Sequence, residues 1–98
     1  MNKYQALLEG KNFLIESEGK LQKHGFYTTR YIEAKNPEEA ELKAVETIKN
    51  DRELIDAVKN ERSNPPMIYL EELYELESFE GLNSPETGYS FYIDDGND

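Results

Sequence analysis

Apolar side chains recur at every second position over residues 4–16, which is the pattern of a β-strand with one buried face. The apolar members of the pattern are Tyr4, Ala6, Leu8, Phe13 and Ile15. The pattern shifts by one position at Gly10-Lys11-Asn12, and a phase shift at glycine predicts a β-bulge or a strand break. The N-terminal segment is therefore expected to be extended, with an irregularity in its middle.

A second strand is expected from Gly25 to Lys35, because this segment is rich in β-branched and aromatic residues. Tyr27 and Tyr31 fall on one face of it, and the other face carries Phe26, Thr28, Arg30 and Ile32. The segment Ser17-Glu18-Gly19-Lys20 has the composition of a turn. The two strands are predicted to pair antiparallel, as sequential strands with a short link usually do.

The segment Asn36-Pro37-Glu38-Glu39 predicts the start of a helix. Asn36 can accept hydrogen bonds from free backbone amides, Pro37 fits the first turn, and Glu39 stands at capping-box spacing. The apolar residues that follow at helical spacing are Ala40, Ala44, Val45 and Ile48. One face of this helix is therefore expected to pack on the sheet.

Asn50 and Glu53 repeat the capping spacing, which predicts a second short helix or a bend. The side chains expected to point inward from it are Leu54, Ile55 and Val58. One continuous helix is the alternative, because the apolar residues of the two segments would lie on nearly the same face of such a helix.

The segment Ser63-Asn64-Pro65-Pro66 ends the helical region. Residues 67–79 fit either a strand or a helix, and the Met-Ile-Tyr-Leu start directly after the two prolines favours a strand. Residues 81–87 are expected to form a loop, and residues 88–93 a final short strand.

The fold class predicted from these elements is α+β, in two layers, over residues 1–98 as a single domain. An antiparallel sheet of about four strands is covered on one face by one or two helices, in the order β-β-α(-α)-β-β. The last two strands are expected to be neighbours in the sheet, and residues 94–98 are expected to fray.

Charge is distributed unevenly along the chain. The 98 residues carry a net charge of −10, and after Arg62 there is no lysine or arginine. The acidic residues that follow are Glu71, Glu72, Glu75, Glu77, Glu80, Glu86, Asp94, Asp95 and Asp98. This asymmetry predicts an acidic surface that attracts basic partners and repels nucleic acid and anionic membranes.

The sequence contains no cysteine, so disulfide and thiolate chemistry are excluded. The N-terminus lacks the apolar core of a signal peptide, and no apolar run reaches the ~20 residues needed to span a bilayer. The expected location is cytoplasmic.

Catalytic and metal-binding candidates are few. His24 is the only histidine, and the sequence gives it no orienting partner or nucleophile. On a strand Glu71, Glu75 and Glu77 are expected to share one face, but no ligand loop frames them. The segment Asp94-Asp95-Gly96-Asn97-Asp98 has the composition of a calcium loop without its spacing. Neither a metal nor a cofactor is expected.

Residues 26–48 run from a strand through Glu-Ala-Lys-Asn-Pro-Glu-Glu-Ala into a helix with alanines at helical spacing. This segment resembles the strand-to-helix step of HicB-type antitoxin domains, in which a similar opening starts a helix packed on a small sheet. The acidic C-terminal third departs from that family, and no functional residue carries over. As a whole, the chain is similar to small bacterial α+β proteins that carry no assigned activity.

The function expected from the sequence is a non-enzymatic module that binds a basic protein partner, of the antitoxin, immunity-like or nucleic-acid-mimic type. Tyrosines beside carboxylates favour protein binding, and they can equally complete a thin core. The candidate binding residues are Tyr69, Glu71, Tyr74, Glu75 and Tyr92. The alternatives are a carboxylate-based, metal-dependent hydrolase and a structural homodimer without a ligand.

Overall fold

Two long antiparallel strands, β1 (Asn2–Ser17) and β2 (Lys20–Ala34), form the centre of the sheet. The structure is a computed structural model that describes residues 1–80 and 88–94. A two-residue turn joins the strands, with φ of 53° at Glu18 and 78° at Gly19. Two positive φ angles are what the type I′ hairpin turn requires, and this turn matches the natural twist of paired strands. The predicted hairpin is confirmed.

The predicted irregularity near Gly10 is also confirmed. The β1–β2 register shifts between Gly10 and Phe13, and Asn12 has a φ of 62°, a conformation that asparagine tolerates better than most residues. The Asn12 side-chain amide donates to Asn64 Oδ1 at 2.9 Å and to the Pro65 carbonyl at 3.1 Å. The bulge therefore fixes the segment that connects the helices to the next strand.

Helix α1 (Pro37–Lys49) begins as the sequence predicts. Asn36 Oδ1 accepts a hydrogen bond from the Glu39 amide at 2.8 Å. Glu39 Oε1 in turn accepts from the Lys35 amide at 3.0 Å, one residue before the position that the usual capping box uses. The first turn of α1 is thus held by two reciprocal hydrogen bonds between side chains and the backbone.

Helix α2 (Arg52–Ala57) is separate from α1, so one continuous helix is ruled out. Its N-cap is Asp51, whose Oδ1 accepts from the Glu53 amide at 3.1 Å. Asn50, which the spacing marks as the cap, instead ends α1 by donating its amide to the Glu46 carbonyl at 2.9 Å.

Residues 67–79 are a strand in their first part: β3 (Met67–Leu76) pairs antiparallel with β1. The last strand, β4 (Tyr89–Ile93), pairs with β2. The sheet order is β3-β1-β2-β4, so β3 and β4 lie at opposite edges and the expectation that they are neighbours is wrong. The two strands are separated in sequence by much more than a hairpin turn, so sequence adjacency did not constrain them to pair. The loop expected at 81–87 and the fraying end at 95–98 lie outside the described residues.

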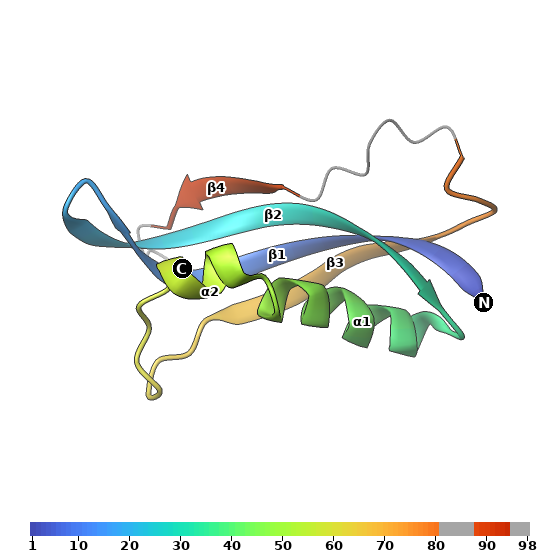
Figure 1. Cartoon of the computed structure of the whole chain (residues 1–98), viewed down its shortest axis with the longest axis horizontal. Helices are drawn as coiled ribbons and strands as arrows, with labels where there is room; N and C mark the ends of the chain where they lie inside the picture. The colour runs from blue at the N-terminus through green and yellow to red at the C-terminus, as the bar shows by residue number, and fades with distance from the viewer. Residues whose placement is uncertain (81–87, 95–98) are drawn as a thin grey trace.

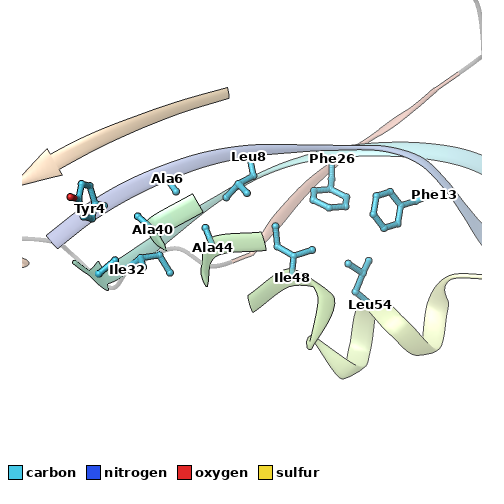
Figure 2. Packing of buried hydrophobic residues seen from close by; sticks show 11 residues of the cluster. Tyr4, Ala6, Leu8, Phe13, Phe26, Ile32, Ala40, Ala44, Ile48 and Leu54 are labelled. Carbon is cyan, nitrogen blue, oxygen red and sulfur yellow. The ribbon is translucent and has the colours of Figure 1, made fainter. Parts of the chain in front are cut away.

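The predicted fold class is observed: a four-stranded antiparallel sheet with α1 and α2 along one face (Figure 1). The core lies between these layers, where side chains of the sheet and of the helices point toward one another (Figure 2). Its buried members are Tyr4, Ala6, Leu8, Phe13, Phe26, Ile32, Ala34, Ala40, Ala44, Ile48 and Leu54.

The small alanines of α1 allow the helix to approach the sheet closely. In α2 only Leu54 is buried and Val58 is half-buried. Ile55, expected to point inward, is 49% exposed, because it stands about a quarter turn away from Leu54 on the helix.

Candidate functional site

The face of the sheet opposite the helices, here called the open face, is covered by neither α1 nor α2 (Figure 1). Its side chains come from strand positions that alternate with the core positions. They include Leu7, Glu9, Tyr27, Thr29, Tyr31, Tyr69, Glu71, Glu72, Tyr74 and Tyr92. Tyrosines and glutamates thus make up most of these side chains, which come from all four strands of the sheet.

Glu9 occupies the centre of the open face. It stands opposite Tyr27 on β2 and opposite Tyr69 on β3, so the three side chains form a row across the sheet. Glu9 is only 8% exposed, whereas Tyr27 is 52% and Tyr69 44% exposed. A recessed carboxylate therefore lies between two tyrosines that project into solvent.

Tyr92 reaches Glu9 from the edge strand β4. Its hydroxyl donates to Glu9 Oε2 at 2.5 Å, and its ring lies 5.6 Å from the Tyr27 ring. The ring can cross β2 because the residue beneath it is Gly25, where a Cβ atom would overlap it. Three strands therefore contribute to the environment of one carboxylate.

The titration of the open-face groups follows from these contacts. The hydrogen bond from Tyr92 holds the pKa of Glu9 below its usual value, and burial opposes that effect. Its neighbour Glu71 has a raised pKa, because it shares a hydrogen bond with Glu9 and is repelled by its charge. The pKa values of Tyr27 and Tyr92 are raised next to the same carboxylate, by contact with Glu9 for Tyr27 and first by burial for Tyr92. Of these two carboxyl groups, Glu9 is thus the one that ionises at the lower pH.

No lysine or arginine nitrogen within residues 1–80 and 88–94 comes within ion-pair distance of either Glu9 or Glu71. Lys11 favours the charged forms of both carboxyls, but only as the last or a minor contribution to each. The charge on Glu9 is thus held by hydroxyl groups rather than by a cation.

One end of the open face is closed by the chain itself. Phe79 lies edge-on to Tyr31 with ring centres 6.0 Å apart, and Lys3 Nζ lies 5.9 Å from the Phe79 ring. These contacts are at the end of β1 that is remote from Glu9. Among the described residues, Tyr27 and Tyr69 on either side of the recessed Glu9 remain about half exposed.

The structure brings together some of the residues selected from the sequence. Tyr69 and Glu71 border Glu9, and Tyr92 reaches it from the other edge of the sheet. Tyr74 is on the same face, further along β3 and opposite Gln5, and it is 47% exposed.

Glu75 is not part of this group. It stands opposite the buried Tyr4 and so belongs to the helix-covered side of the sheet. A register shift opposite Leu7 and Leu8 leaves Glu71 as an extra residue in β3, which reverses the alternation beyond it. The expectation that Glu71 and Glu75 share a face is therefore wrong.

Glu9 and Tyr27 are the site residues that the sequence analysis did not select. The alternation places both on polar strand faces, but only the sheet order shows that β3 and β4 bring further tyrosines and Glu71 to them. An acidic residue between Leu8 and Gly10 on a central strand was the available signal, because charges are rarely buried without a function or a partner.

The remaining candidates show no catalytic arrangement. His24 Nδ1 is 2.9 Å from the Gln22 carbonyl, and its ring meets Phe91 edge-on at 6.2 Å. Among the residues described, Asp, Glu and His side chains form no group of three or more able to hold a metal ion. None of the helices described is both long and apolar enough to cross a membrane.

Comparison with protein-family models, with curated proteins and with solved structures found no match to this chain. The resemblance of residues 26–48 to HicB-type antitoxin domains stays a prediction.

Proposed function

We propose that this protein is a non-enzymatic interaction module that binds a basic protein segment on the open face of its sheet. The observation that carries the proposal is Glu9, a recessed and ionised carboxylate next to a second carboxyl group and without a cation of the chain itself. The proposed surface is centred on β1, whereas the sequence analysis placed the acidic surface on the C-terminal third of the chain.

Energetics favour a cationic ligand at this position. Hydrogen bonds keep the pKa of Glu9 low in spite of its burial, so the carboxylate is a charged group that a cationic ligand can pair with. A lysine or arginine from a partner would neutralise Glu9 and relieve its repulsion with Glu71. The exposed rings of Tyr27, Tyr69 and Tyr74 add contact area at a small loss of side-chain entropy.

The same features disfavour the two simplest alternatives. Two copies joined through their open faces would bring Glu9 and Glu71 of each copy toward like charges. A further strand that paired with the free edge of β3 would meet a β-bulge and the glutamates Glu72 and Glu75. Bulges and charged side chains at a sheet edge disfavour such pairing. A basic segment lying across the face meets neither obstacle.

The test uses a fluorescein-labelled peptide of alternating arginine and glycine and its acidic counterpart of alternating glutamate and glycine. Fluorescence anisotropy should show binding of the basic peptide alone, weakening by about tenfold or more between about 50 and 200 mM salt if several charges are paired. The double variant Tyr27→Ala/Tyr69→Ala should lose most of the affinity.

The matched control is Leu42→Ala/Ile55→Ala, which removes two exposed apolar side chains from the helix side, where they are 66% and 49% exposed. It should bind as the parent chain does. Salt-independent binding, or equal losses in the two double variants, would count against a charge-led interface on the open face.

A further inference from the structure

At one position on the open face, two carboxyl groups from neighbouring strands lie close together. Glu9 and Glu71 come from adjacent strands, and each alters the titration of the other. Such a pair is relieved by a shared proton, by a metal ion, or by a cationic group that bonds to both. A metal ion finds no third acidic or histidine ligand here among the described residues.

Aromatic side chains flank this pair of carboxyl groups. Tyr27 and Tyr69 each stand one strand away from Glu9, so their backbones are about 10 Å apart with the carboxylate between them. That spacing admits a flat group between two rings. Glu9 is 8% exposed and both tyrosines are near half exposed, so a ligand group that pairs with this recessed carboxylate needs a long side chain.

We propose that Glu9 and Glu71 receive one arginine side chain of the partner, with its guanidinium lying between Tyr27 and Tyr69. This inference rests on the proposed function and names the group that the open face recognises. A guanidinium presents parallel N–H donors that match two adjacent carboxylates, and its planar, weakly hydrated surface stacks on aromatic rings. A lysine ammonium offers a point charge, which is strongly hydrated and lacks the flat surface.

Tyr92 acts as a positioning residue in this arrangement. Its hydroxyl donates to Glu9 Oε2, and Tyr27 and Glu71 also hydrogen-bond to Glu9, so the ligand would share this carboxylate with them. Tyr92→Phe should therefore lower the affinity for arginine less than Glu9→Gln does, because it removes the orientation of the carboxylate but not its charge.

The experiment compares two labelled peptides of equal charge, alternating arginine-glycine and alternating lysine-glycine, on the full chain. The arginine peptide should bind about fivefold more tightly or better. Glu9→Gln and Glu71→Gln should each weaken it by about tenfold or more and abolish the difference between the peptides. Glu41→Gln, which removes an exposed carboxylate of α1, is the control for net charge and should change affinity by less than about twofold.

Glu71 is exposed, so Glu71→Gln keeps the test valid if Glu9→Gln does not fold. Equal affinity for the two peptides, with Glu9→Gln and Glu71→Gln behaving like Glu41→Gln, would overturn the arginine site. The proposed function would survive that result if Tyr27→Ala/Tyr69→Ala still abolishes binding. Equal affinity that both glutamate variants abolish would overturn the choice of arginine over lysine. Absence of binding to either peptide would overturn both proposals.

Discussion

Arg30 is a charged residue on the covered face of the sheet, and it is only 8% exposed. Its guanidinium lies 5.1 Å from the centre of the Tyr89 ring. Its Nε and Nη2 atoms are buried without a hydrogen-bond partner. The attraction of Asp51, whose pKa Arg30 helps to lower, offsets part of this cost.

Replacing Arg30 by an apolar side chain of similar length is therefore expected to be tolerated. Arg30→Met should leave the free energy of unfolding within about 1 kcal/mol of the parent value or raise it, because two buried donors no longer lack partners. Arg30→Ala should cost about 2–4 kcal/mol, because it leaves a cavity under Tyr89. Urea denaturation compares the two, with the exposed Arg62→Met as control. A loss above about 2 kcal/mol in Arg30→Met would show that the guanidinium is well bonded.

A second residue-scale contact joins Asp51 to Tyr89. The Tyr89 hydroxyl donates to Asp51 Oδ2 at 2.7 Å, and this bond is the main cause of the lowered pKa of Asp51. Because the folded-state pKa is lower than the unfolded one, the contact stabilises the fold above the unfolded pKa of about 3.9. That stability is lost as pH falls through the lower folded value.

Tyr89→Phe is expected to reduce the free energy of unfolding by about 1 kcal/mol at neutral pH. The difference between the parent chain and the variant should shrink as pH falls below about 4, because Asp51 then becomes protonated. Urea titrations of both chains across that range measure it. A difference that stays constant with pH would mean that the contribution of the Tyr89 hydroxyl does not depend on the charge of Asp51.

At the scale of elements, β4 is the strand with the least support. It has five residues, pairs only with β2, and supplies Tyr92 to the Glu9 site. Its attachment depends on the open space above Gly25, since a Cβ there would overlap the Tyr92 ring. Elements of this kind open locally at a lower free energy than the body of a domain.

Gly25→Ala is therefore expected to displace Tyr92 and to destabilise the protein by about 1–3 kcal/mol. Amide hydrogen exchange should accelerate in β4 more than in α1. Gly88→Ala is the matched control, because a Cβ at Gly88 has no atom within 4 Å. Unchanged exchange in β4 of Gly25→Ala would show that the strand is held by its backbone pairing alone.

Local features of the elements could be predicted from sequence because their causes lie within a few residues. Asn36 and Glu39 close the start of α1, and Gly19 allows the hairpin turn. The bulge near Gly10 follows from a visible change of phase. Each of these features depends only on residues that are close to one another in the sequence.

The features that could not be predicted depend on pairing between distant segments. The register shift in β3 has no glycine to mark it, so Glu71 and Glu75 were assigned to one face. The sheet order, which places β3 beside β1, is set by contacts across the core and not by sequence adjacency. For the same reason Glu9 and Tyr27 became site candidates only once their neighbours across the sheet were known.

At the scale of the whole molecule, the acidic third of the chain does not form one patch. Glu71, Glu72 and Glu75 are on β3 at one edge, and Asp94 follows β4 at the other. The body is elongated, with extents of 44 × 28 × 26 Å and a radius of gyration of 14.6 Å, against about 13 Å for a compact domain of this length. Among the described residues, the acidic side chains of β3 and Asp94 therefore lie at opposite edges of the sheet.

This distribution leads to a prediction about salt. Uncompensated like charges destabilise a compact state, and added ions screen them. Raising sodium chloride from about 20 to about 300 mM should increase the free energy of unfolding by about 0.5–1 kcal/mol, while it weakens binding of a basic partner. Urea denaturation at each salt concentration measures the first effect and peptide anisotropy the second.

The control for the salt prediction is Glu72→Lys/Glu75→Lys, which lowers the net negative charge at one edge without touching Glu9. Its stability should depend less on salt than that of the parent chain, because fewer repulsive pairs remain to be screened. Opposite responses of folding and binding to the same ions would identify the uncompensated negative charge of the chain as the source of both. If the stability of the parent chain is flat or falls with salt, its carboxylates are compensated locally, and long-range attraction of a cationic partner loses its basis.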